Sequence, residues 1–233
     1  MLEKLAKQTA VYGISTIAVR FLSYLLTPVF TRVFEPEAYG IVTDVYALIP
    51  FALVVLTMGL ESAYFRFAAK ADAAAAAAGG TEGEIAARAR AGKRRLFATA
   101  WGVTLLAASL FFLLTAFGRE RVAEWMGEAY VAHPEYVLLV AAVVWFDVAA
   151  CLPFSRLREQ GRAMTFVGIK ALGVVVNVAL AIGFALAGLY GTPFGVGWVF
   201  VANLIASAVT FNVILLTTDR TCWSIRCRCS SAA

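Results

Sequence analysis

Residues 136–154 read YVLLVAAVVWFDVAACLPF, an apolar run that carries one charged side chain, Asp147. An α-helix needs about 20 apolar residues to cross the hydrocarbon core of a bilayer. A charge inside such a run is costly and usually has a partner or a water-filled cavity beside it. The stretch therefore predicts a membrane-spanning helix with a polar position near its centre.

The rest of the chain has the composition of a membrane protein. Of its 233 residues, 61% are hydrophobic and 15% are charged, whereas soluble domains average about 25% charged residues. Water cannot solvate so much apolar surface, so we expect an all-α, polytopic membrane bundle of six transmembrane helices. The predicted spans are residues 9–33, 41–65, 96–117, 136–154, 165–190 and 194–217.

Lysine and arginine residues sort to alternate sides of these spans. Fifteen of them fall in the N-terminal segment, the 66–95 loop, the 155–164 loop and the tail, whereas three fall in the opposite connections. By the positive-inside rule, both termini are expected to be cytoplasmic, in a bacterial inner membrane. Because topology accounts for the net charge of +5, we expect no nucleic-acid partner.

The 66–95 segment contains the low-complexity stretch DAAAAAAGGTEGE and then the basic cluster ARARAGKRR. Its biased composition predicts a tolerated cytoplasmic insertion or a linker. The basic cluster is expected to face anionic lipid headgroups.

Arg20 interrupts the first predicted span, in STIAVRFLSYLLTP at residues 15–28. An arginine near mid-membrane costs about 2.5–3.5 kcal/mol on insertion scales. Thr16, Tyr24 and Thr27 lie at helical steps of three and four from it, so they share one polar face. That face either buries an ion pair that fixes helix packing or lines a cavity for a solute, and we favour the cavity.

Other polar residues inside the spans extend this hypothesis. Asp147 is placed to pair with Arg20 or to bind a coupling cation. Lys170 aligns with Asn177 in a polar stripe, although its long side chain is also able to reach the cytoplasmic interface. Asn203 lies on a polar face of the sixth span, where hydrogen bonds between helices explain it without a substrate.

No catalytic or metal-binding pattern is present in the sequence. Its single histidine, His133, lies in a loop, and no glycine-rich phosphate motif occurs. The spacing of Cys222, Cys227 and Cys229 matches no standard zinc site. We therefore expect a transporter rather than an enzyme, without a cofactor or metal and driven by an ion gradient or the membrane potential.

The first two spans carry a family resemblance. LAKQTAVYGISTIAVRFLSYLLTPVFTRVFEPEAYGIVTDVYAL at residues 5–48, followed by TMGLESAYFRF, resembles the opening of Wzx-type polysaccharide biosynthesis proteins. These are oligosaccharide flippases of the MATE-like superfamily, with twelve to fourteen spans in two six-helix lobes. The resemblance implies a partner, undecaprenyl-pyrophosphate-linked oligosaccharide, and a cationic central cavity lined by Arg20 and Lys170.

The chain departs from that pattern after the sixth span. Its tail, TTDRTCWSIRCRCSSAA, changes composition abruptly. We expect an N-terminal lobe with a frameshifted segment at 218–233, completed by a second copy or by a separate C-terminal half. The alternatives are a cation-coupled exporter of small amphiphilic compounds, with Asp147 as coupling site, and a non-transporting membrane fragment.

Overall fold

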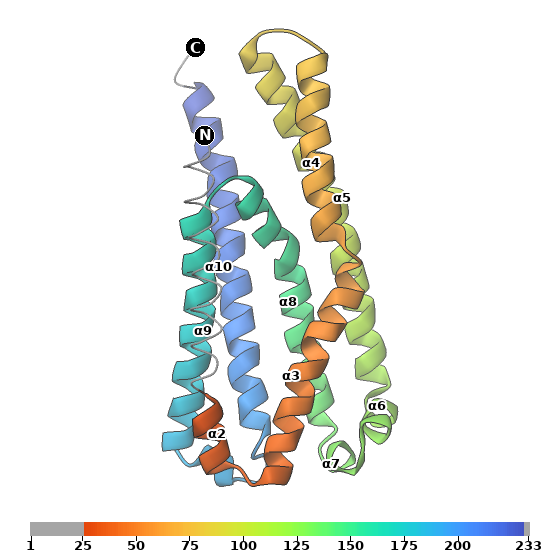
Figure 1. The fold of residues 1–233 in the computed structure, drawn as a ribbon, viewed down its shortest axis with the longest axis vertical. Helices are drawn as coiled ribbons and strands as arrows, with labels where there is room; N and C mark the ends of the chain where they lie inside the picture. The colour runs from red at the N-terminus through yellow and green to blue at the C-terminus, as the bar shows by residue number, and fades with distance from the viewer. Residues whose placement is uncertain (1–25, 231–233) are drawn as a thin grey trace.

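The computed structural model of the protein describes residues 26–230, and every regular element in that range is helical (Figure 1). The predicted all-α class is therefore confirmed. The elements are α2 (Thr27–Val33), α3 (Pro36–Thr57), α4 (Leu60–Ala77), α5 (Glu82–Phe117), α6 (Arg119–Met126), α7 (Glu128–Val131), α8 (Glu135–Glu159), α9 (Ala163–Leu186), η1 (Leu189–Gly191) and α10 (Gly197–Ser230).

Within the described residues, five helical stretches are long and apolar enough to cross a membrane. They are Pro36–Ala77, Glu82–Phe117, Glu135–Glu159, Ala163–Leu186 and Gly197–Thr218. A multi-pass membrane protein is thus confirmed by length and composition. The first predicted span lies outside the described residues except for α2, so the total of six remains a prediction.

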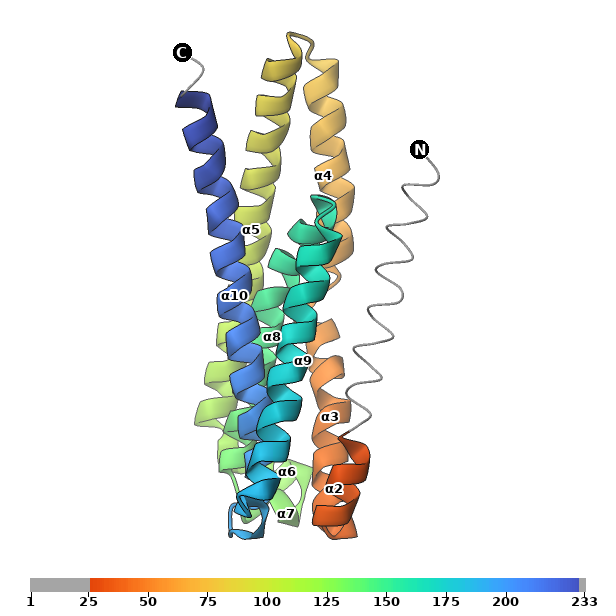
Figure 2. The same cartoon turned by 90° about the vertical axis from the view of Figure 1, so that its left-hand side faces the viewer.

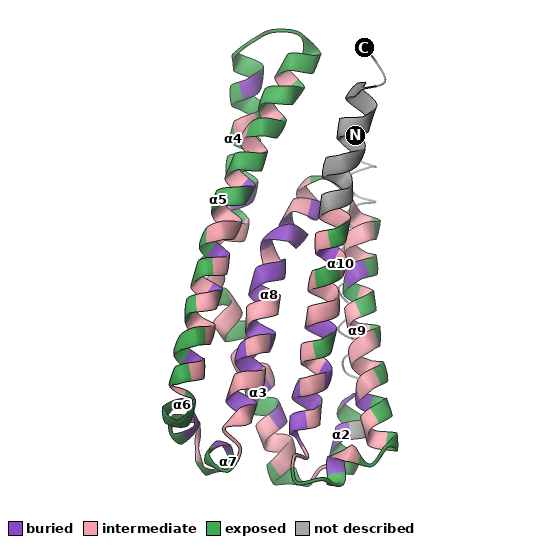
Figure 3. Cartoon of the chain, turned by 180° about the vertical axis from the view of Figure 1, so that it is seen from behind, coloured by how far each residue is buried: buried purple, intermediate pink, exposed green. Residues whose placement is uncertain are grey.

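Helix α8, which contains the stretch 136–154, lies at the centre of the bundle (Figure 3). It packs against α3, α4, α5, α9 and α10. In its most apolar stretch 61% of residues are buried, compared with 11% in α5. Small and β-branched residues such as Val144, Val148 and Ala149 are buried there, and they let neighbouring helices approach closely.

The outer surface of α5 is apolar along one line. Leu106, Leu110 and Leu114 follow one another at intervals of four, and 73%, 59% and 65% of their surfaces are exposed. A stripe of exposed leucines on a membrane-length helix is expected to face lipid rather than water.

A break in the helix, at Met58 and Gly59, separates α3 from α4 (Figure 2). Met58 and Gly59 both adopt the left-handed conformation, with φ of 47° and 70°. Glycine takes that conformation without the clash that a side chain causes, whereas methionine rarely does. The break ends α3 and places Glu61 in the first turn of α4.

Most of the 66–95 segment, which the sequence predicts to be a cytoplasmic insertion or linker, is helical. Helix α4 continues to Ala77, and α5 starts at Glu82, so the pair forms a hairpin that extends past the end of α8 (Figure 1). The alanines that suggested low complexity are strong helix formers. Thr81 and Glu84 form a capping box that starts α5.

An ion-pair cluster ties this hairpin to α8. Lys93 Nζ lies 2.7 Å from Asp72 Oδ2 on α4 and 2.6 Å from Glu159 Oε1 at the end of α8. The two segments that the charge pattern assigns to one side of the membrane, 66–95 and 155–164, are therefore in direct contact. This contact supports the alternation of the spans, and the compartment at each end remains a prediction.

Candidate functional site

A cavity of about 620 Å³ opens between α3, α4, α8, α9 and α10. Its volume lies in the range of small-molecule sites, which is about 300–1,000 Å³. Charged and polar side chains reach it from all five helices. They are Tyr46, Glu61, Asp147, Arg158, Lys170, Asn177, Asn203, Ser207 and Thr210.

Four of the residues predicted from the sequence converge on this cavity. Asp147 comes from α8, Lys170 and Asn177 come from α9, and Asn203 comes from α10. The spacing of Lys170 and Asn177 by seven residues places both on the same helix face.

The other predicted positions are not brought to the cavity by the described structure. Thr27 begins α2, is exposed and is not among the residues that line the cavity. Thr16, Arg20 and Tyr24 lie outside the described residues.

Asp147 is held by a neighbouring helix. Ser207 Oγ on α10 donates a hydrogen bond of 2.8 Å to Asp147 Oδ1. Among the side chains of residues 26–218 that the structure describes, no cation lies within 4.0 Å of this carboxylate. The described structure therefore leaves the carboxylate charge without a contact ion pair.

Lys170 packs against an aromatic ring rather than against Asp147. Its Nζ lies 4.3 Å from the centroid of the Phe154 ring on α8. A ring face attracts a cation but does not neutralise it. The ammonium is exposed and lines the cavity, so it is available to an anionic solute.

Close contacts between helices shape the cavity wall. The side chains of Tyr46 on α3 and Asn177 on α9 lie next to each other in this wall. Gly173 on α9 faces α10 so closely that a Cβ at this position would overlap the Thr210 hydroxyl. Both contacts join α9 to its neighbours at the level of the cavity.

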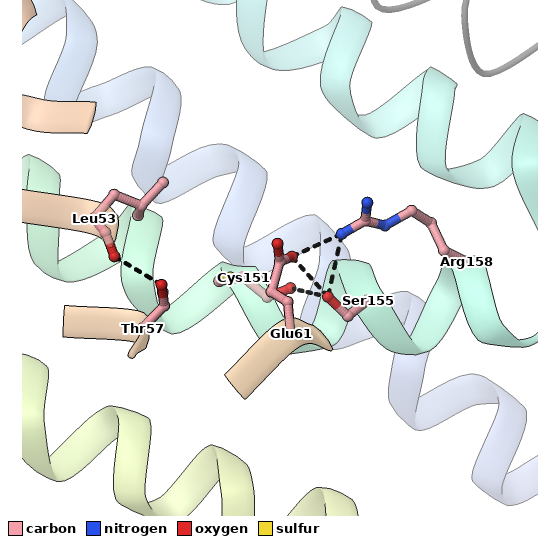
Figure 4. A network of polar contacts seen from close by, with 6 residues as sticks. All are labelled: Leu53, Thr57, Glu61, Cys151, Ser155 and Arg158. Atoms are coloured by element: carbon pink, nitrogen blue, oxygen red, sulfur yellow. Dashed lines mark hydrogen bonds and ion pairs between the residues drawn. The ribbon is translucent and has the colours of Figure 1, made fainter. Parts of the chain in front are cut away.

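One end of the cavity holds a compact polar network (Figure 4). Arg158 Nη2 donates to Glu61 Oε1 at 2.7 Å and to Ser155 Oγ at 3.2 Å. Ser155 Oγ lies 2.7 Å from Glu61 Oε1 and 3.1 Å from the Cys151 carbonyl oxygen, and its single proton serves one of them at a time. The network joins the first turn of α4 to the last turns of α8.

Comparison with protein families gives a match over almost the whole chain. The family model described as "Polysaccharide biosynthesis protein" matches residues 5–229. The chain belongs to this family. Comparisons with curated proteins and with solved structures gave no significant match.

Membership in the polysaccharide biosynthesis family agrees with the resemblance seen in the first two spans. The match also includes residues 218–229 of the compositionally unusual tail. Together with the five apolar helical stretches among the described residues, membership makes the chain a multi-pass membrane protein with a flippase-type role.

Glu61 and Arg158 are not among the site residues that the sequence predicts for this family member. Arg158 was counted as a loop charge, and Glu61 lay at the end of a predicted span. A signal for Arg158 was nevertheless present. Asp147, Cys151, Phe154 and Arg158 follow at steps of four, three and four, so they lie on one face of α8.

Proposed function

We propose that the protein translocates undecaprenyl-pyrophosphate-linked oligosaccharide units from the cytoplasmic to the outer leaflet of the bacterial inner membrane. In this proposal the headgroup crosses through the cavity by alternating access while the lipid tail remains in the bilayer. Family membership supports the flippase role, and the chemistry of the cavity supports the substrate class.

The observation that carries the proposal is the exposed Lys170 ammonium in a cavity that also presents amide groups. Lys170 offers three N–H donors to a phosphate oxygen, and no described carboxylate lies within 4.0 Å of it. Asn177 and Asn203 present both donors and acceptors, as sugar hydroxyls require. A diphosphate joined to a sugar therefore matches the polar groups of the cavity.

Arg20 adds a second cation to this proposal. Its central depth in the first predicted span and its polar helical face suit a cavity wall. A guanidinium donates several charge-assisted hydrogen bonds to phosphate and stays protonated at physiological pH. We therefore assign it to the diphosphate together with Lys170.

A second lobe is part of the proposal, because the resemblance implies two lobes facing one central cavity. Either a second copy of this chain or a separate C-terminal half would supply it. If two copies associate, transport per molecule should rise with the protein-to-lipid ratio in liposomes that contain this chain alone.

The test is headgroup translocation in liposomes that contain the protein and a fluorescent undecaprenyl-pyrophosphate oligosaccharide. We expect the headgroup to become accessible to an impermeant quencher on the opposite side. Lys170→Gln should slow this transfer about tenfold or more, because it removes a charge-assisted contact. A rate no higher than in protein-free liposomes at any protein density would overturn the proposal.

Lys70→Gln is the matched control. Lys70 is an exposed lysine on α4, its Nζ lies 5.3 Å from the centroid of the Phe67 ring, and it does not line the cavity. Removing its charge should leave the transfer rate unchanged.

Asp147 supports a second candidate function, a cation-coupled exporter of small amphiphilic compounds. Its carboxylate has no contact ion pair among the described residues, as a site for a coupling cation requires. Ion-dependent export of an amphiphilic dye, without translocation of the lipid-linked sugar, would favour this candidate.

A further inference from the structure

We infer that Glu61 is an internal competitor for the anion site of Arg158. A diphosphate that enters the cavity takes the place of the Glu61 carboxylate on the Arg158 guanidinium. This inference rests on the proposed function for its lipid-linked substrate, whereas its chemistry concerns diphosphate binding alone.

The first argument is that the ion pair is accessible. Both partners line the cavity, and their side chains are 36% and 39% exposed. A half-exposed ion pair is only weakly stabilising, since water screens it. A doubly charged anion can therefore compete with the single carboxylate for this cation.

The second argument is that the guanidinium has unused donors. Glu61 and Ser155 are both bound by Nη2. Arg158 Nε is buried and has no acceptor among the described residues. A buried donor without an acceptor is costly, and a phosphate oxygen is able to satisfy it together with Nη2 in the two-point geometry that arginine prefers.

Among the described residues, the two cations that line the cavity, Arg158 and Lys170, lie beside one pair of aromatic rings. The Arg158 guanidinium carbon lies 5.6 Å from the Phe166 ring centroid, and Lys170 Nζ lies 4.3 Å from the Phe154 ring centroid. The two rings contact each other with centroids 5.4 Å apart. Arg158 and Lys170 thus flank one aromatic pair, and Glu61 lies on the Arg158 side.

The exchange has a structural consequence at the helix break. Glu61 lies two residues after Gly59, where α4 begins. Its contacts with Ser155 and Arg158 tie α4 to α8 beside that break. When the diphosphate replaces Glu61, this tie between α4 and α8 is lost next to the point where the backbone already bends, whereas the Lys93 ion pairs still connect the hairpin to α8.

The test is a calorimetric titration of the full chain in lipid nanodiscs with inorganic pyrophosphate, which measures the affinity of the chain for this anion. Glu61→Gln should tighten binding about tenfold, because the competing carboxylate is gone. Arg158→Gln should weaken binding by about the same factor. In the Arg158→Gln background, Glu61→Gln should have almost no further effect, because both residues act through one contact.

Two further variants guard against misfolding and general charge effects. Ser155→Ala leaves both charges in place but removes the hydroxyl between them, so it should tighten binding about threefold. Arg156→Gln removes a cation that lies over the Phe97 ring at 4.7 Å and does not line the cavity, so binding should be unchanged.

Several results would overturn the inference. An absence of pyrophosphate binding contradicts the competition between Glu61 and the diphosphate. Binding that is unchanged or weaker in the Glu61→Gln and Ser155→Ala variants contradicts it as well. If Glu61→Gln still raises the pyrophosphate affinity in the Arg158→Gln background, the effect is a general effect of charge and does not act through Arg158. Because this assay needs no translocation, diphosphate exchange without sugar transfer would refute only the proposed function.

A titration with farnesyl pyrophosphate distinguishes a lipid-linked diphosphate from the free inorganic ion as the ligand of this site. A lipid-linked source requires farnesyl pyrophosphate to bind more tightly than the inorganic ion, with the same dependence on Arg158. Equal affinities would rule out a contribution from the lipid. Farnesol, which lacks the diphosphate, should show no dependence on Arg158.

Discussion

Ser207 on α10 donates its hydroxyl proton to Asp147 on α8 over 2.8 Å, and both residues line the cavity. The hydrogen bond orients a carboxylate that has no cation in contact with it among the described residues. It also joins the central helix to α10, where Ser207 is buried. The hydrogen bond gives this carboxylate a part in packing, and we propose that it also acts on the solute; substitutions are able to separate the two roles.

Asp147→Asn should abolish or strongly reduce headgroup translocation if a coupling cation bound at Asp147 drives it, while it changes the free energy of unfolding by less than about 1 kcal/mol. The amide has the shape of the carboxylate and still accepts from Ser207, but it lacks the charge. Thermal unfolding in nanodiscs and the liposome assay measure the two effects separately. Asp44→Asn is the control, since Asp44 is exposed on α3 and outside the cavity. Normal translocation by Asp147→Asn would show that its charge has no role in transport.

Gly173→Ala should destabilise the protein by about 1–3 kcal/mol, because the added Cβ overlaps the Thr210 hydroxyl on α10. The measurement is the unfolding temperature of the purified protein in nanodiscs. Gly168→Ala on the same helix is the matched control, since its added Cβ meets no atom within 4 Å. Adding Thr210→Ala to Gly173→Ala should restore part of the loss, and no restoration would argue against this contact as the cause.

Gly59→Ala should cost about 1–2 kcal/mol of unfolding free energy, because a side chain is strained at φ of 70°. The same change should reduce translocation if the break between α3 and α4 is required for movement of α4. Gly40→Ala, within α3 and with no atom within 4 Å of the added Cβ, should be neutral or stabilising. Equal effects at the two glycines would contradict a special role for the break.

Lys93→Met should loosen the hairpin of α4 and α5 without unfolding the bundle. It removes two ion pairs, to Asp72 and to Glu159, while it keeps the apolar stem. Partly exposed pairs contribute about 1 kcal/mol or less each, so amide exchange between residues 66 and 95 should quicken severalfold. Arg90→Met, which removes only a bond to the Ala86 carbonyl oxygen on its own helix, should leave that exchange almost unchanged.

The sequence by itself determined the class of this protein and several residues of its cavity. Runs of apolar residues must be helical in a bilayer, because no water is present to bond the backbone. That argument places Asp147 in α8 and Lys170 in α9. Helical spacing then aligns Lys170 with Asn177, and these positions do line one cavity. Local periodicity was sufficient to align Lys170 with Asn177 because both residues lie on the single helix α9.

Only the tertiary structure decided which faces meet. Glu61 and Arg158 are 97 residues apart, and no periodicity relates a residue on α4 to one on α8. Their contact depends on the left-handed turn at Met58 and Gly59 and on the central position of α8. For a similar reason the sequence predicts only a cytoplasmic insertion or linker at 66–95, and the tertiary structure shows that this segment forms a helical hairpin in contact with α8. Helix pairing is set by side-chain packing and by hydrogen bonds between distant segments, and these do not appear in the order of residues along the chain.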